Sequence, residues 1–320
     1  MMNQESKVYI AGHSGLVGSS IMRRLEKDGC YQLVTMSHSE LDLTRQDHVE
    51  DFFDRQRPEY VFLCAARVGG IMANSTYQAQ FIYDNLMIAA NVIHASYKHG
   101  VKKLLNLGSS CIYPKYAPQP LKEEYLLSGQ LEPTNEPYAI AKIAAIKLCR
   151  YYNRQYKTNY LSVMPTNLYG INDNFNLETS HVLPALIRKF HEAKENLEPQ
   201  VTLWGTGSPK REFLLADDFA DACIYIMENF DEKDIGEFIN IGTGQDLTIK
   251  DLAGLISDIV GYEGKIIWDT SKPDGTPQKL LDVSRINRLG WNAGTGLSKG
   301  IDLTYQWYMK NNPNRGGKGI

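Results

Sequence analysis

The chain has 320 residues, 22% of them charged, and a formal net charge of −3. That length is enough for one large domain or two smaller ones, and the near balance of charge argues against a surface that binds nucleic acid. The first residues, MMNQESKVYI, lack the basic segment and apolar run of a signal peptide. The apolar stretches are strand-length, far short of the roughly 20 residues that a membrane-spanning helix needs. We therefore expect neither nucleic acid nor membrane as a partner.

Five cysteines are scattered along the chain without paired spacing, at positions 30, 64, 111, 149 and 223. An odd number of unpaired cysteines in a chain of this size fits free thiols in a reducing compartment better than a disulfide framework or a zinc site. The composition therefore predicts a soluble, cytoplasmic globular protein without a metal.

Through the first half of the chain, apolar runs of strand length alternate with segments of helical periodicity. Strands are expected at 7–12, 31–36, 60–66, 101–110 and 160–170, and helices at 16–29, 47–56, 85–99 and 136–156. Strands that are apolar on both faces and separated by helices are typical of a parallel sheet covered on both sides. The pattern predicts an α/β protein built on a Rossmann-type, doubly wound parallel sheet.

After about residue 170 the sequence becomes richer in turns, with helices expected at 217–230 and 248–260. We interpret residues 1–170 as a dinucleotide-binding domain. Residues 171–320 are expected to form mainly a smaller, mixed α/β lobe that binds the substrate and closes over it. Some segments of this second half are expected to return to the first domain.

A glycine-rich loop lies between the first expected strand and helix. Gly12 permits a tight turn, Gly15 lets the backbone approach a pyrophosphate, and Gly18 lets helix and strand pack closely. The helix that follows presents free N–H groups and a positive dipole end to that anion. The loop as a whole, which predicts dinucleotide binding, comprises Gly12, His13, Ser14, Gly15, Leu16, Val17 and Gly18.

The residues around the second strand leave the choice of dinucleotide open. A 2′-phosphate favours arginine or lysine in the glycine loop or after the second strand. The residues at these positions carry no permanent charge: Ser14, Ser37, His38 and Ser39. No acidic residue ends the second strand to bind a free ribose hydroxyl, and Asp42 is expected beside the adenine. From these residues, NADPH and NADH remain alternatives.

Tyr138 and Lys142 are four residues apart and share one face of the expected helix 136–156. A tyrosine titrates near 10, and a neighbouring ammonium and nicotinamide cation are expected to lower that pKa. The pair can then exchange a proton with a carbonyl oxygen. Ser109, about thirty residues earlier at a strand end, can hold the same oxygen. Together with the glycine loop, these residues predict a carbonyl reductase.

These motifs resemble those of the GDP-L-fucose synthases, which are extended short-chain dehydrogenase/reductases. The resemblance runs in order through AGHSGLVGS, AARVGGIMAN, GSSCIYPK, EPTNEPYAIAKIAAIKLC, SVMPTNLYG, SHVLPALIRKFHEA, WGTGSPKREFL and SKPDGTPQKLLDV. It implies conversion of GDP-4-keto-6-deoxy-D-mannose to GDP-L-fucose, by epimerisation at C3 and C5 followed by reduction at C4 with NADPH. It also implies a homodimer, for which the apolar faces of 85–99 and 139–152 are available.

The resemblance assigns roles to residues of this chain. Ser109, Tyr138 and Lys142 match the reductase trio, and Cys111 and His181 match the cysteine and histidine that epimerise. The further residues implied at the cofactor are His38, Asp42, Leu43, Leu107, Gly108, Lys142, Pro165, Asn167, Leu168 and His181. Those implied at the GDP-sugar are Lys189, Trp204, Arg211 and Asp274, with Lys279 either a phosphate contact or a solvated surface lysine.

A thiol at Cys111 has a chemical use in such a site. A C4 ketone acidifies the hydrogens on both flanking carbons, and a thiol whose pKa is lowered by nearby positive charge can remove them. An imidazole exchanges protons near neutrality, so His181 can return a proton to the opposite face. Outside these motifs, a small buried hydrophobe is the commoner role of a free cysteine.

Two departures and several rival functions bear on the prediction. Known bacterial members carry arginines where this chain has Ser14 and His38, so the preference for NADPH is an expectation from resemblance. The nearest rival is a C4 reductase, with or without epimerisation, of another GDP-4-keto hexose or heptose. A GDP-sugar 4,6-dehydratase would need a carboxylate where Ser110 and Cys111 stand, and a 4-epimerase has no use for the cysteine and histidine. A non-catalytic scaffold would predict loss of Tyr138 or Lys142.

Overall fold

The computed structural model of the protein describes residues 2–3, 5–29, 32–272 and 274–311, and a six-stranded sheet forms its centre. Every neighbouring pair in this sheet runs parallel, which confirms the predicted fold class. The chain order reverses between β1 and β3, and ligands of doubly wound sheets bind at such a switch point. Across the sheet the strands are β2 (Gln32–Val34), β1 (Lys7–Ala11), β3 (Tyr60–Leu63), β4 (Lys103–Leu107), β5 (Tyr160–Pro165) and β9 (Ile239–Ile241).

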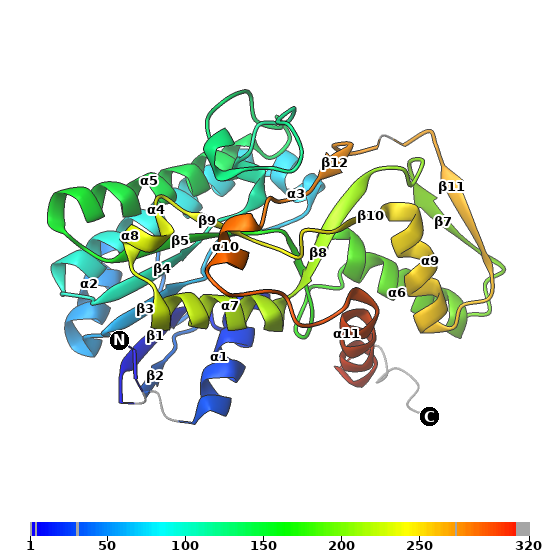
Figure 1. The fold of residues 1–320 in the computed structure, drawn as a ribbon. Coiled ribbons are helices and arrows are strands. Elements are labelled where there is room, and N and C mark those ends of the chain that lie inside the picture. Colours follow the sequence, from blue (N-terminus) through cyan, green and yellow to red (C-terminus); the bar gives the residue numbers. More distant parts are fainter. Residues whose placement is uncertain (1, 4, 30–31, 273, 312–320) are drawn as a thin grey trace.

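Helices cover both faces of this sheet (Figure 1). One face carries α1 (Leu16–Asp28) and α7 (Ala216–Asn229), and the other carries α2 (Gln46–Gln56), α4 (Gln78–Lys98) and α5 (Glu136–Tyr156). Helix α4 begins before the expected start at residue 85. The shorter helices are α3 (Ile71–Thr76), α8 (Glu232–Ile235), α10 (Ser284–Arg288), η1 (Ser110–Ile112) and η2 (Glu123–Tyr125). In the described part of the chain, no helix has the length and apolar character to cross a bilayer.

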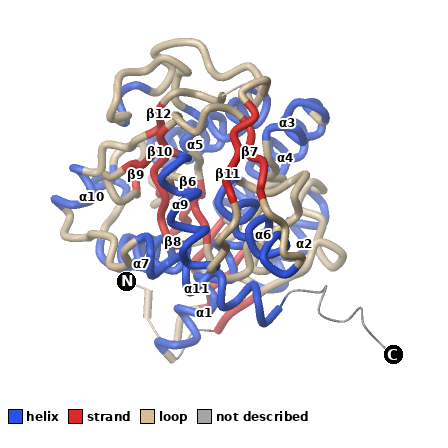
Figure 2. The backbone as a smooth tube through the Cα atoms, turned by 90° about the vertical axis from the view of Figure 1, so that its right-hand side faces the viewer, coloured by secondary structure: helices blue, strands red, loops and turns tan. Residues whose placement is uncertain are grey.

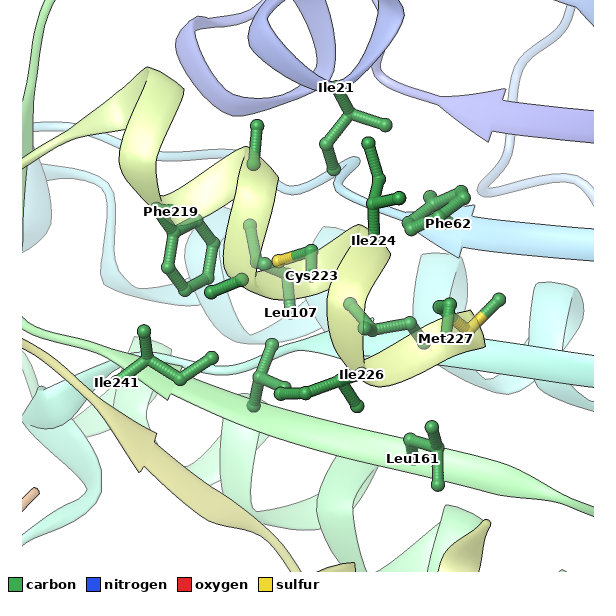
Figure 3. Close-up of a cluster of buried hydrophobic side chains, with 14 of the residues drawn as sticks. Ile21, Phe62, Leu107, Leu161, Phe219, Cys223, Ile224, Ile226, Met227 and Ile241 are labelled. Carbon is green, nitrogen blue, oxygen red and sulfur yellow. The ribbon is translucent and has the colours of Figure 1, made fainter. Parts of the chain in front are cut away.

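The core between α7 and the sheet explains why the strands are apolar on both faces (Figure 3). Phe219, Cys223 and Ile226 of α7 point toward the strands. Leu161 of β5 and Ile241 of β9 meet them from the sheet. A second cluster joins the opposite face to α2, α4 and α5. Burial on both faces fixes the sheet as a rigid platform whose strand ends carry the loops described below.

The second lobe is organised around one strand, β8 (Lys210–Leu215). In Figure 2 this lobe faces the viewer. Strands β6 (Asn167–Tyr169) and β12 (Gln278–Lys279) pair with β8 in parallel, and β10 (Asp246–Thr248) pairs with it antiparallel. The other elements of the lobe are α6 (Val182–Glu195), β7 (Gln200–Trp204), α9 (Ile249–Val260), β11 (Lys265–Asp269) and α11 (Leu297–Asn311).

The chain passes from the central sheet to this lobe at Thr166. A single strand was expected over 160–170, and this expectation is wrong, because β5 and β6 belong to different sheets. The hydroxyl of Thr166 and the amide of Asn167 both donate to the backbone carbonyl of Glu212, at 3.2 and 2.8 Å. These bonds turn the chain onto β8. We propose the two-domain division with this boundary, with α7 and β9 returning to the first domain.

Glu212 is a fully buried carboxylate at the centre of the second lobe. Its Oε1 accepts hydrogen bonds from the amides of Thr243 and Gly244 at 2.6 and 2.8 Å, and its Oε2 accepts one from the amide of Leu281 at 2.9 Å. Burial raises the pKa of Glu212, and these bonds oppose the rise. One side chain therefore connects β8 to the loop after β9 and to the segment after β12.

Replacing Glu212 by Gln should destabilise the protein. The amide group keeps the shape of the carboxylate but turns an NH₂ toward a backbone N–H, which then lacks an acceptor. We expect a loss of about 1–3 kcal/mol in the free energy of unfolding, measured by urea denaturation. The exposed Glu263→Gln is the control, with a change below about 0.5 kcal/mol. Equal stability of the two variants would contradict this role.

Candidate active site

The glycine loop lies at the carboxyl end of β1. Gly12 has a positive φ of +81°, and a Cβ there would lie 2.8 Å from the backbone nitrogen of Ala65. A Cβ on Gly18 would lie 2.1 Å from the carbonyl oxygen of Gly12. Gly15 is exposed, and an added Cβ there would make only an ordinary van der Waals contact, 3.5 Å from the carbonyl oxygen of Gly12. Gly12 and Gly18 thus allow close packing, and Gly15 leaves room for a ligand.

The start of α1 has the features of an anion site. Gly15 is its N-cap, and within the described helix no side chain caps it and no acidic residue stands in its first turn. The Nδ1 atom of His13 is buried and has no hydrogen-bond partner among the described residues. Free backbone N–H groups at a helix start attract a pyrophosphate. The residues present therefore fit a dinucleotide.

The other predicted cofactor residues are distributed around the same edge of the sheet. Asp42 accepts hydrogen bonds from the amide and hydroxyl of Thr44, which hold the pKa of Asp42 below its usual range. His38 is exposed near Asp42. The carbonyl of Leu43 accepts a bond from Asn91. The remaining members lie at or just after strand ends: Leu107 and Gly108 at β4, Pro165 at β5, and Asn167 and Leu168 in β6.

Sequence reasoning missed two contacts near the loop. The carboxylate of Glu40 accepts hydrogen bonds from the amide and hydroxyl of Ser37, at 2.8 and 2.7 Å. The amide of Asn172 donates to the carbonyl of Ser14 at 2.7 Å, so the loop before α6 is attached to the glycine loop. The first contact closes a turn, and the second joins residues 158 positions apart, so neither follows from a motif in the sequence.

The predicted reductase trio meets between β4 and α5. The Lys142 ammonium donates to the carbonyl of Leu107 at 2.7 Å and lies 5.7 Å from the centre of the Tyr138 ring. The Ser109 hydroxyl acts on the Tyr138 phenol, whose pKa it lowers. Ser109 is also the N-cap of η1, where its Oγ accepts from the amide of Cys111 at 3.4 Å. The structure thus brings together the three residues that the sequence predicted to act together.

The expectation that the pKa of Tyr138 is lowered is wrong. Burial raises it, the neighbouring Cys111 raises it further, and Ser109 only partly opposes this. Burial also lowers the pKa of Lys142 to about 8, although Cys111 and Cys64 oppose that fall. Removing a group from water disfavours its charged form. The phenol is therefore held in its protonated form, which suits a proton donor.

Cys111 adjoins this trio. It is 7% exposed and lines a small pocket with Tyr113, Lys115 and Lys279. The expectation that its pKa is lowered is wrong, because burial raises the pKa of Cys111. The Lys279 ammonium, the Ser109 hydroxyl and the Lys142 ammonium oppose that rise, in this order. The thiol thus faces polar groups from two lobes within an enclosed site.

His181 is the N-cap residue of α6. The loop that precedes it is attached to the dinucleotide lobe, because the amide of Gly70 donates to the carbonyl of Thr179 at 3.0 Å. The residue keeps a solvent-exposed surface, yet desolvation by the surrounding protein lowers the pKa of His181, and Lys279 lowers it further. A lowered pKa makes the imidazolium a stronger acid.

The predicted substrate residues all come from the second lobe. Lys189 lies on α6 and Arg211 on β8, and burial lowers the pKa of both. Trp204 ends β7 and is 64% exposed, with Lys272 over its ring. Asp274 accepts from the amide and hydroxyl of Thr206, at 2.9 and 2.7 Å. These side chains are partly exposed cations, a flat aromatic surface and a fixed carboxylate, which suit a nucleotide diphosphate.

Sequence reasoning missed the polar lining beside Cys111. Lys115 and Glu132 form an ion pair at 2.9 Å in the same pocket. The lining also includes Gln119 and Gln278, which are joined by a hydrogen bond from the Gln119 amide to the Gln278 carbonyl. Gln278 lies 159 positions after Gln119, and only folding brings it to this pocket.

Comparison with known proteins adds to this geometry. Residues 8–242 match the model of the NAD dependent epimerase/dehydratase family. The chain belongs to this family. GDP-L-fucose synthase 1 of Arabidopsis thaliana is 57% identical over 315 residues, which cover 98% of this chain and 97% of the relative. GDP-L-fucose synthase of Escherichia coli (strain K12) is 55% identical over 313 residues, which cover 96% and 98%.

Among solved structures, a GDP-mannoheptose C4 reductase from Campylobacter jejuni with NADP bound has a TM-score of 0.90 and 44% sequence identity. The match covers 97% of this chain and 100% of the reductase chain. The predicted resemblance to the GDP-L-fucose synthases is therefore confirmed over nearly the whole chain. These comparisons do not test the roles of the individual site residues, which stay predictions.

The glycine loop can be tested with a matched pair of variants. Gly18→Ala should cost about 1–3 kcal/mol of unfolding free energy, because its Cβ overlaps the Gly12 carbonyl. Gly15→Ala should leave stability nearly unchanged and weaken dinucleotide binding, because the methyl group enters the space kept for the pyrophosphate. Thermal denaturation and a binding titration measure the two effects. Wild-type stability of Gly18→Ala would contradict the packing role.

Proposed function

We propose that this protein converts GDP-4-keto-6-deoxy-D-mannose to GDP-L-fucose, by epimerising C3 and C5 and then reducing C4 with NADPH. The observation that carries this proposal is the position of Cys111 beside the reductase trio, where it interacts with Tyr138 and Lys142. A ketone reductase needs the trio alone. A thiol in the same enclosure, with His181 on the neighbouring lobe, adds the proton chemistry of an epimerase.

The epimerisation steps require a base, an acid and hydrogen-bond donors to the ketone oxygen. In the proposed reaction the Cys111 thiolate takes a proton from a carbon next to the C4 ketone. The C–H bond breaks, an S–H bond forms, and the electron pair enters the carbonyl system as an enolate. Ser109 and Tyr138 hold the oxygen through this stage. His181 then returns a proton to the opposite face of the carbon, which inverts it.

The reduction step uses the same oxygen contacts. NADPH supplies the hydride that reduces C4. The phenol of Tyr138 gives its proton to the C4 oxygen, and its raised pKa keeps that proton in place until the step occurs. Lys142, held by Leu107, places its ammonium beside the phenol and favours the phenolate once the proton has left.

NADPH is the cofactor that we propose from the combined observations. The uncapped start of α1 and the exposed backbone at Gly15 suit a dinucleotide pyrophosphate. The similar Campylobacter jejuni reductase binds NADP. Ser14 and His38 stand where known bacterial members carry arginines, so the 2′-phosphate would be bound by hydroxyl and imidazole groups.

A second candidate function is reduction of a GDP-4-keto heptose without epimerisation. It is favoured by the name of the Campylobacter jejuni relative, which is a C4 reductase of a GDP-mannoheptose. The two GDP-L-fucose synthases described above are more similar to this chain, at 57 and 55% identity. That difference, together with the polar surroundings of Cys111, makes the fucose synthase reaction the better-supported function.

We further propose that the protein acts as a homodimer in the cytoplasm. Helices α4 and α5 pack together and expose apolar side chains, among them Tyr83, Ile140 and Tyr151. A second copy of the chain would cover this surface. Cys64, Cys111, Cys149 and Cys223 are free, as in a reducing compartment, and Cys30 lies outside the described residues.

The proposed dimer predicts a change of mass with a single substitution. Ile140→Arg places a charge in the apolar surface of α5 and should convert a dimer of the wild-type protein to a monomer. Sedimentation velocity measures both masses, and the exposed Lys250→Arg is a control that should leave the dimer intact. A wild-type protein that sediments as a monomer would contradict the proposal.

Two variants should separate the proposed half-reactions. Cys111→Ser should abolish deuterium exchange at C3 and C5 in deuterated water while it keeps reduction of an already epimerised keto sugar within a few-fold. Tyr138→Phe should slow NADPH oxidation by about 10²–10⁴-fold, because it lacks the donor hydroxyl, and should slow exchange less, because Ser109 still holds the oxygen. Mass spectrometry follows the exchange and absorbance follows the NADPH. Undiminished exchange in Cys111→Ser would refute its role as the base.

A further inference from the structure

Lys279 reaches the pocket of Cys111 from the opposite lobe. Strand β12 lies between the two lobes (Figure 1), and Lys279 lines the same small pocket as the thiol. In the register of the lobe sheet, Lys279 pairs with Arg211 of β8. Lys279 therefore neighbours both Arg211, a predicted diphosphate contact, and the pocket of Cys111, the predicted base.

The backbone around Lys279 is held on both sides. The amide of Leu281 donates to the buried carboxylate of Glu212 at 2.9 Å, and the amide of Leu280 donates to the Gln119 side chain at 2.9 Å. The amide of Leu121 donates to the carbonyl of Leu280 at 2.7 Å. The Gln278 side chain donates to Asp246 at 2.6 Å. These contacts place the start of the Lys279 side chain in a fixed position relative to Cys111.

We propose that Lys279 is a positioning residue for proton transfer, whose ammonium stabilises the thiolate of Cys111 and so makes the thiol available as a base. This inference rests on the proposed function, because it assigns Lys279 a task in the epimerisation and none in the reduction. It replaces the two alternatives drawn from the sequence, a phosphate contact and a solvated surface lysine.

The charges around the thiol support this assignment. The groups that act on Cys111 or adjoin it are the ammonium groups of Lys279 and Lys142, the hydroxyl of Ser109 and the phenol of Tyr138. Tyr113, Lys115 and Glu132 line the same pocket, where Lys115 and Glu132 are paired with each other. Among the described residues, Lys279 opposes the burial-driven rise in the pKa of Cys111 most strongly. Lys142 acts more weakly on the thiol, and its ammonium donates to Leu107.

The same ammonium acts on the predicted acid. Lys279 lowers the pKa of His181, after the larger effect of burial. One cation thus favours loss of a proton from both groups, which gives a thiolate base and a more acidic imidazolium. Burial lowers the pKa of Lys279, Cys111 raises it, Arg211 lowers it, and Glu132 raises it, in this order. A diphosphate that neutralises Arg211 would therefore favour the ammonium form of Lys279 beside the thiol.

The test measures the thiol directly, without turnover. Wild-type protein, Lys279→Gln and Lys279→Arg are alkylated with iodoacetamide between pH 6 and pH 10, and peptide mass spectrometry quantifies the modification of Cys111. Loss of the ammonium raises the pKa of the thiol, so the alkylation profile of Lys279→Gln should move to higher pH by about one unit, with roughly tenfold slower alkylation at pH 7. Lys279→Arg should restore most of the wild-type profile, and the exposed Lys250→Gln should match wild type.

Turnover then separates this role from phosphate binding. At saturating substrate, Lys279→Gln should slow C3 and C5 exchange roughly tenfold at pH 7 and leave reduction of the epimerised keto sugar unchanged. An unshifted alkylation profile, with a raised KM for both half-reactions, would overturn the proposal and assign Lys279 to the diphosphate. Exchange that persists in Cys111→Ser would instead contradict the proposed function, so the two failures are distinguishable.

Discussion

The hydrogen bond from the Lys142 ammonium to the Leu107 carbonyl joins α5 to the carboxyl end of β4. Tyr138 stands one helical turn before Lys142, so this bond fixes the phenol against Ser109 and beside Cys111. The sheet makes the bond possible, because burial of both its faces gives β4 a rigid end. A site that must hold one carbonyl oxygen through several proton transfers depends on this rigidity.

Burial of the site determines the charge states that its residues favour. Burial raises the pKa of Tyr138 and Cys111 and lowers that of Lys142, so each group is pushed toward its neutral form. Charge must therefore come from specific neighbours. The dinucleotide lobe contributes Lys142, and the second lobe contributes Lys279 and His181. We infer that the epimerising half of the chemistry depends on the second lobe in a way that the reducing half does not.

The sequence predicted those features that local patterns determine. The central strands, the helices around them and the glycine loop follow from periodicity and from steric needs at Gly12 and Gly18, which act within a few residues. The break at Thr166 was not predictable, because it depends on Glu212, far along the chain. The direction of the pKa shifts at Tyr138 and Cys111 was also missed, because burial by distant segments outweighs the charges that the motifs suggest. The ion pair of Lys115 and Glu132 was missed because both residues lie outside helices and strands and share no motif.

The central claim is that one site inverts two carbons and then reduces the ketone between them. The most direct measurement is to incubate the protein with GDP-4-keto-6-deoxy-D-mannose and NADPH in deuterated water and to identify the product by nuclear magnetic resonance. We expect GDP-L-fucose with deuterium at both C3 and C5. A C4-reduced sugar that keeps its original configuration and carries no deuterium at these carbons would contradict the account.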